Sequence, residues 1–196
     1  KQVLVCAPTN TAVDLLTEKL IAEGIHVLRI GHPARVSDDL LKTTIDGKII
    51  NSDYYKDIKA LRKNAEEYFK MASKYKRTFG KEEAEQRALY YTEAKRCVKE
   101  ANLLEDYIID NELSTAQVIT CTPVNAASKF IRDKQFSTLF FDEASQALDA
   151  QIWIPLLKSK RLILAGDHHQ LAPVVKSRQA ENGGLKITML DKLMVN

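Results

Sequence analysis

The sequence predicts an α/β fold with a largely parallel sheet, into which a helical segment is inserted. Short apolar runs alternate with helix-like stretches near both ends of the chain, whereas residues 35–115 contain no strand pattern. Strands that alternate with helices are typical of parallel sheets covered by helices. Two later apolar runs also end abruptly in carboxylates, as buried parallel strands do when their carboxyl ends face a reaction site.

The elements of the α/β part follow from these apolar runs. Before residue 31 we expect a strand, a helix and a strand at residues 3–6, 11–23 and 25–30. From residue 117 the alternation resumes, with strands at 117–121, 137–141 and 161–165 and helices at 125–131 and 148–157. We therefore assign residues 1–34 and 116–196 to one α/β domain.

The insertion, residues 35–115, has helical periodicity. Apolar residues recur at steps of three and four from Ile58 to Tyr75 and again from Ala84 to Ile108, with an interruption at Thr78-Phe79-Gly80. This pattern predicts two long antiparallel helices. Basic residues outnumber acidic ones eight to four between residues 53 and 78, whereas acidic residues lead nine to five between residues 81 and 112. Attraction between the helices and a solvated surface is the favoured explanation, and contact with nucleic-acid phosphates is the alternative.

Composition excludes several classes of protein. The chain is 45% hydrophobic and 28% charged, as ordinary globular proteins are, and no apolar run approaches the roughly 20 residues of a membrane span. The net charge of +3 is too small to indicate nucleic-acid binding by itself. Three cysteines without metal-type spacing predict reduced thiols and a location in the cytoplasm or nucleus.

Asp142 and Glu143 directly follow the apolar run 138–141. Hydrolysis of a nucleoside triphosphate requires a carboxylate that holds Mg²⁺ and a group that positions or deprotonates water. Asp142 is placed to hold Mg²⁺, directly or through water, and Glu143 is placed to act on the attacking water. The alternative is that the pair only caps the following helix.

A second polar block follows the next predicted strand. Asp167 comes directly after Gly166, and Gln170 adds a neutral amide that can sense a γ-phosphate without competing for the metal. We therefore expect Asp167 and Gln170 to join the first carboxylate pair in binding ATP. We do not assign a metal to His168 and His169, because adjacent side chains at a strand end diverge and no third ligand has a useful spacing.

Two turns share the spacing Cys-x-Pro-x-Asn-x-Ala, one beginning at Cys6 and the other at Cys121. Each follows an apolar run and opens a helix, which leaves backbone N–H groups available at the carboxyl edge of the sheet. Such turns are suited to bind successive phosphates of one nucleic-acid strand, and ordinary helix capping is the alternative. The candidate contacts are Pro8, Thr9, Asn10, Thr122, Pro123 and Asn125.

Taken together, these motifs resemble the superfamily 1 helicases, specifically the Upf1-like group that includes immunoglobulin mu-binding protein, senataxin and the nonsense-mediated-decay helicase. Residues 28–35 are especially similar to the mu-binding branch. The resemblance covers residues 1–36 and 116–195, and residues 35–115 correspond by position to the helical subdomain 1C. The matching segments look like motif Ia at residues 7–14, the later nucleic-acid motif at 118–122, motif II at 141–147 and motif III at 166–173.

The resemblance implies a RecA-like domain that uses ATP and Mg²⁺ to step along single-stranded RNA or DNA, usually from 5′ to 3′. By the same resemblance Asp142 binds Mg²⁺, Glu143 is the catalytic base, and Gln170 couples the γ-phosphate to strand movement. The residues that would contact the nucleic-acid backbone are Pro8, Thr9, Asn10 and Thr122.

Two parts of that motor do not occur in these 196 residues: the loop Gly-x-x-x-x-Gly-Lys-[Ser/Thr], and the second RecA-like domain with its arginine finger. We expect the parent chain to supply both. The rival interpretations are a non-helicase P-loop ATPase, a partner-docking module that uses the helical hairpin, and a two-carboxylate nuclease, which is the least favoured.

We predict no measurable ATPase activity for the isolated 196-residue chain, because a triphosphate binds very weakly without the amides and lysine of the phosphate-binding loop. A steady-state phosphate-release assay, with and without nucleic acid, tests this. Nucleic-acid-stimulated turnover that disappears in Glu143→Gln would contradict it.

Overall fold

The computed structural model describes residues 1–74, 80–167, 169 and 171–194. The chain divides into two compact units, one formed by Lys1–Asp46 with Thr115–Asn196 and the other by Gly47–Ser114. The first unit extends to Asp46, past the boundary expected after residue 34. It does so because Val36, Leu40 and Ile45 are buried and Thr44 forms a parallel bridge with Arg29.

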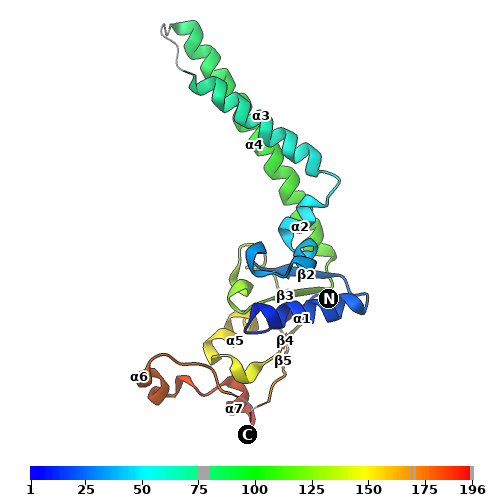
Figure 1. Cartoon of the computed structure of the whole chain (residues 1–196), viewed down its shortest axis with the longest axis vertical. Helices are drawn as coiled ribbons and strands as arrows, with labels where there is room; N and C mark the ends of the chain where they lie inside the picture. The colour runs from blue at the N-terminus through cyan, green and yellow to red at the C-terminus, as the bar shows by residue number, and fades with distance from the viewer. Residues whose placement is uncertain (75–79, 168, 170, 195–196) are drawn as a thin grey trace. The chain divides into compact units, whose positions relative to one another are not determined.

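The first unit is built on a parallel sheet of five strands in the order β2-β3-β1-β4-β5, shown in Figure 1. Every strand pairs in parallel with its neighbours, which confirms the predicted α/β class. In β1 and β4, for example, Cys6 lies opposite Phe141. The strands are β1 Val3–Cys6, β2 Val27–Ile30, β3 Val118–Cys121, β4 Thr138–Phe141 and β5 Leu162–Leu164.

Alternating side chains divide the sheet into two faces. On one face Val5, Val27 and Val118 form a buried cluster against Leu16 and Leu20 of helix α1. On the opposite face lie buried residues that include Leu4, Ile119, Leu139 and Phe141. The helices of this unit are α1 Asn10–Ala22, α5 Asp149–Leu156, α6 Arg178–Ala180 and α7 Met189–Met194.

Short helical turns connect these elements: η1 Pro33–Arg35, η2 Asp38–Thr43, η3 Val124–Ala127, η4 Ala144–Gln146 and the π-type η5 Glu181–Leu185. The helix predicted at 125–131 is wrong, because a 3₁₀ turn ends at Ala127 and Ser128 adopts an extended conformation. Ile131 is fully buried, and Lys158 Nζ binds the carbonyl oxygens of Ile131 and Arg132. Burial and this side-chain donor therefore replace the hydrogen bonds of a regular helix.

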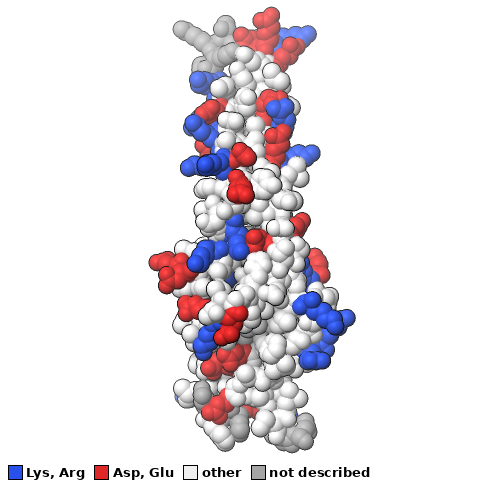
Figure 2. Space-filling view, turned by 90° about the vertical axis from the view of Figure 1, so that its right-hand side faces the viewer, with Lys and Arg blue, Asp and Glu red and all other residues white. Residues whose placement is uncertain are grey.

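The second unit contains α3 Tyr55–Ser73 and most of α4 Lys81–Thr115, and α2 Ile45–Ile50 spans the boundary of the two units. As residue numbers rise along α3 their partners on α4 fall, because Tyr54 contacts Tyr107, Arg62 binds Glu105 and Tyr68 stacks on Tyr90. The two helices are therefore antiparallel, and their buried cluster is Ile58, Ala101 and Ile108. Figure 2 shows acidic and basic side chains interleaved over one face of this unit.

Ion pairs account for part of the charge of this unit. Arg62 joins the two helices through Glu105, whereas Lys63–Glu67 and Arg96–Glu93 lie within one helix each. Tyr75, the last predicted position of the first helix, and Thr78 and Phe79 of the predicted interruption lie outside the described residues. In the described part of the chain, no helix is both long enough and apolar enough to cross a membrane.

We predict that Phe141→Ala lowers the free energy of unfolding by about 3–5 kcal/mol, because this fully buried ring leaves a cavity when it is removed. Phe140→Ala on the same strand is the control, since its side chain is 41% exposed and its loss is expected to cost less than about 1.5 kcal/mol. Urea unfolding of both variants measures the difference. Equal losses would contradict the assignment of the two faces.

Candidate nucleotide and nucleic-acid site

The predicted site residues follow four neighbouring strands at the carboxyl edge of the sheet. Thr122 follows β3, Pro8 follows β1, Asp142 follows β4, and Asp167 comes three residues after β5 ends at Leu164. Because the strand order is β3-β1-β4-β5, the nucleic-acid turns are adjacent and the carboxylates lie beside them. The parallel topology thus brings together residues that are far apart in sequence.

Asp142 is held in place by its backbone. Its N–H donates to the carbonyl oxygen of Cys6 at 2.9 Å, which continues the β1–β4 ladder one residue past β4. Its side chain is half-buried, and so is that of Glu143. Asp142 is therefore fixed at the edge, with its carboxylate still partly accessible to a ligand.

Glu143 has a left-handed backbone conformation, with φ 55° and ψ 40°. Among the described residues it is the one non-glycine with positive φ. Such a conformation costs about 1–3 kcal/mol and tends to occur at functional sites. The Glu143 carboxylate accepts a hydrogen bond from Gln146 Nε2 at 2.9 Å, and its carbonyl oxygen accepts one from the Gln146 N–H at 2.9 Å. Gln146 thus orients Glu143 at both the side chain and the backbone.

The segment after β5 is joined tightly to this turn. Ala165 N–H donates to Phe141 O at 2.8 Å, and Ala144 N–H donates to Ala165 O at 2.9 Å. A Cβ atom on Gly166 would lie 3.0 Å from the backbone nitrogen of Ala144 and 3.1 Å from that of Ser145. Only glycine permits this close approach, so the two predicted motifs form one packed junction.

Asp167 lies beyond the junction and is exposed. Its Oδ1 accepts a hydrogen bond from the His169 N–H at 2.9 Å, which shapes the turn. Gln170, the predicted γ-phosphate sensor, and His168 lie outside the described residues. No group of three or more potential metal-binding side chains occurs within the described ranges.

The first predicted nucleic-acid turn combines a helix cap with a hydrogen bond to a buried arginine. Thr9 caps α1, since its Oγ1 accepts a hydrogen bond from Ala12 N at 3.2 Å. Asn10 Oδ1 accepts a hydrogen bond from Arg29 Nη2 at 3.1 Å. Capping and a phosphate-binding role are compatible here, because Thr9 is exposed and Pro8 is half-buried.

Arg29 is a residue that sequence reasoning missed. It is completely buried within β2, and its Nε binds Asp14 Oδ1 of α1 at 2.9 Å. Asp14 Oδ2 accepts a further hydrogen bond from Ser37 N at 3.0 Å. Arg29 therefore connects β2, the start of α1 and the segment before η2. The sequence feature that could have revealed Arg29 is its position as the single charged residue inside the apolar run Val27–Ile30.

The second turn has a different construction. Pro123 is buried and precedes η3 without a side-chain cap, and Thr122 and Asn125 are half-buried. Cys6 and Cys121, which lead into the two turns, are register partners with their sulfur atoms 3.7 Å apart. Burial, together with the Cys121 hydrogen bond, raises the pKa of the Cys6 thiol well above its ordinary value. Both turns thus leave the sheet from neighbouring strands, directly after a pair of buried cysteines.

The all-parallel topology and the row of polar groups at the carboxyl edge are those of RecA-like α/β domains, a class that uses nucleotides. A family model described as an AAA domain matches residues 1–178. The chain therefore belongs to this AAA domain family, as a superfamily 1 helicase domain of the Upf1-like group.

Named relatives agree with this assignment. The chain is 35% identical over 98% of its length to DNA-binding protein SMUBP-2 of Mesocricetus auratus, of which it covers 19%. It is 34% identical over 91% of its length to the DNA polymerase alpha-associated DNA helicase A of Schizosaccharomyces pombe, covering 26%. It is 33% identical over 98% of its length to the ATP-dependent helicase NAM7 of Saccharomyces cerevisiae, covering 18%. The chain thus spans about a fifth of the length of SMUBP-2.

We predict that Gly166→Ala lowers the free energy of unfolding by about 1–3 kcal/mol, because the added Cβ meets two backbone nitrogens that have no room to move. Gly183→Ala is the matched control, since a Cβ there meets no atom within 4 Å. Thermal or urea unfolding compares the two. A Gly166→Ala protein as stable as the control would show that the junction is looser than described.

Proposed function

We propose that the chain forms part of the motor of an ATP-dependent helicase that moves along single-stranded RNA or DNA from 5′ to 3′. The observation that supports this most is the junction at the ends of β4 and β5. There Asp142 and the strained Glu143 are fixed by backbone hydrogen bonds beside Gly166-Asp167. Family membership favours this over a non-helicase P-loop ATPase.

The described residues fit a Mg²⁺–nucleotide complex. Mg²⁺ in such sites takes one or two protein carboxylates, with water and phosphate oxygens as its other ligands. Asp142 supplies a half-buried carboxylate, and the neighbouring Ser145 Oγ is a buried hydroxyl without a hydrogen-bond partner among the described residues. We assign Asp142 as the Mg²⁺ ligand, directly or through water. When bound, Mg²⁺ neutralises charge on the triphosphate.

Glu143 is the catalytic base in this proposal. Its carboxylate is oriented by Gln146, and it accepts a proton from the water that attacks the γ-phosphate. Asp167 and Gln170 complete the nucleotide side of the site, with Gln170 transmitting the state of the γ-phosphate to the nucleic-acid turns. The parent protein supplies the phosphate-binding loop and a second RecA-like domain.

The two turns bind the backbone of the nucleic acid. Thr9 is exposed, Pro8, Asn10, Thr122 and Asn125 are half-buried, and Pro123 is buried. All six follow the neighbouring strands β1 and β3. Phosphate contacts carry no base information and are available in both RNA and DNA, so the contacts assigned here do not select between the two. We assign the protein to the cytoplasm or nucleus, in keeping with three cysteines that form no disulfide.

A partner-docking role for the helical unit is the second candidate. Leu89, Leu103 and Tyr107 of α4 are each 58% exposed, which leaves apolar side chains available for contact with a partner. Residues 35–115 remain the proposed insertion, and Gly47–Ser114 is its compact part.

We predict that Glu143→Gln in the full-length protein lowers the kcat of nucleic-acid-stimulated ATP hydrolysis by a factor of about 100 or more, because the amide no longer accepts a proton. Nucleic-acid affinity is expected to stay unchanged. Glu18→Gln, which alters an exposed carboxylate of α1, is the control. Retention of wild-type kcat by the Glu143 variant would remove Glu143 from its assigned role.

A further inference from the structure

A basic surface lies at the amino ends of β4 and β5, the end of the strands opposite Asp142. Residues 128–138 and 158–161 contain six basic residues and one acidic residue, Asp133. We call this surface the basic edge, and its members are Lys129, Arg132, Lys134, Lys158, Lys160 and Arg161. Such an excess of one sign attracts polyanions and repels other cations.

Backbone hydrogen bonds join the two segments of the basic edge. Phe136 N–H donates to Lys158 O at 2.7 Å, and Lys160 N–H donates to Phe136 O at 3.2 Å. Leu139 N–H donates to Arg161 O at 2.8 Å as β4 and β5 begin to pair. The backbone segments that carry these cations are therefore held side by side by the sheet, and a ligand has to order only the exposed side chains.

Lys158 has a structural role in this arrangement. Its ammonium donates to the carbonyl oxygen of Ile131 at 3.0 Å and also to that of Arg132. Partial burial lowers the pKa of Lys158, against the influence of Asp133. Lys158 thus fixes the first segment against the second, while Arg132, Lys160 and Arg161 are exposed.

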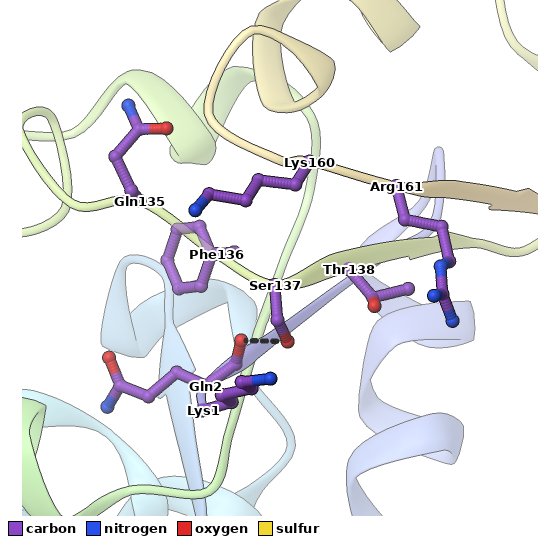
Figure 3. A pocket seen from close by; sticks show the side chains of 8 residues that line it. All are labelled: Lys1, Gln2, Gln135, Phe136, Ser137, Thr138, Lys160 and Arg161. Carbon is purple, nitrogen blue, oxygen red and sulfur yellow. Dashed lines mark hydrogen bonds between the residues drawn. The ribbon is translucent and has the colours of Figure 1, made fainter.

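A hollow of about 570 Å³ opens beside these residues, lined by Lys160 and Arg161 together with polar groups. Figure 3 shows the Lys160 side chain beside the Phe136 ring and Arg161 on the other side of Thr138, with Lys1 and Gln2 across the space from Lys160. Ser137 Oγ donates to Gln2 O at 2.9 Å and ties the strand starts together. Phe136 is the one large apolar residue in the lining, and it is buried.

We propose that the basic edge binds phosphate groups of a nucleic-acid backbone, as a second contact beyond the turns at the carboxyl edge. Arginine and lysine with amide and hydroxyl side chains are the usual partners of backbone phosphates. An acidic peptide also needs apolar pockets for its anchor side chains, and Phe136, the one large apolar side chain of the lining, is buried and offers no such contact. The choice of nucleic acid as the ligand rests on the proposed function. The positive charge and the geometry of the basic edge are observed independently of that function.

The test uses the full-length protein and fluorescent single-stranded DNA of two lengths. A probe of about 8 nucleotides reports on the turns at the carboxyl edge, and one of about 40 nucleotides is long enough to reach the basic edge as well. The variant is Lys160→Gln with Arg161→Gln. The control is Lys19→Gln with Lys42→Gln, which removes the same charge from two exposed positions elsewhere in the same unit.

For the long probe we expect the variant to bind about tenfold more weakly near 0.1 M salt and the slope of log affinity against log salt to flatten by about 1.4, since each lost phosphate contact on a single strand contributes about 0.7. Short-probe binding and the control are expected to match wild type. The proposal would be overturned if the variant bound the long probe as the control does. It would also be overturned if, with polyglutamate as an acidic-peptide probe, the variant lost binding to polyglutamate and not to DNA. Failure of the wild-type protein to bind the short probe would instead count against the proposed function.

Discussion

The site depends on a ladder of backbone hydrogen bonds that continues past the ends of the strands. Asp142 N–H binds Cys6 O, Ala165 N–H binds Phe141 O, and Ala144 N–H binds Ala165 O. Each bond contributes only about 0.5–1.5 kcal/mol, but together they fix the directions in which three chain segments leave the sheet. The positions of the carboxylates are therefore a property of the sheet and not of flexible loops.

The buried Arg29 similarly fixes the turn that follows β1. Its guanidinium is satisfied by Asp14, Asn10 and the carbonyl oxygen of Ile30. A buried ion pair contributes little net stability, because desolvation offsets much of the attraction. The planar guanidinium donates to Asn10 and Asp14 together, which requires one arrangement of these two side chains. The start of α1 is thereby placed at a defined position relative to β2.

The parts of the structure that could be predicted are those with a local cause. The five strands are short apolar runs bounded by polar residues, and their pairing places Asp142 and Asp167 after neighbouring strands. A regular helix at 125–131 does not form, because burial of the Ile131 side chain and the Lys158 donor decide the conformation of this segment. The packing of Val36 and Leu40 into the first unit likewise depends on contacts that no periodicity reveals. The strain at Glu143 was equally hidden, since glutamate has no preference for the left-handed region.

A comparison of free energies explains how Glu143 keeps its left-handed backbone conformation. A left-handed glutamate costs about 1–3 kcal/mol, and an isolated Asp-Glu turn would relax to an ordinary conformation. Gln146 supplies two hydrogen bonds to Glu143, and Ala144 N–H supplies a third to Ala165 O, together about 1.5–4.5 kcal/mol. The two totals are similar, and the bond from Ala144 to Ala165 is the one of the three that depends on the docking of β5. Since Gly166 permits that docking, motif III supports the geometry of motif II before any ligand binds. A displacement of β5 would remove the bond from Ala144 to Ala165 and weaken the support of the turn, which links the position of the Gly166-Asp167 segment to that of the Glu143 carboxylate.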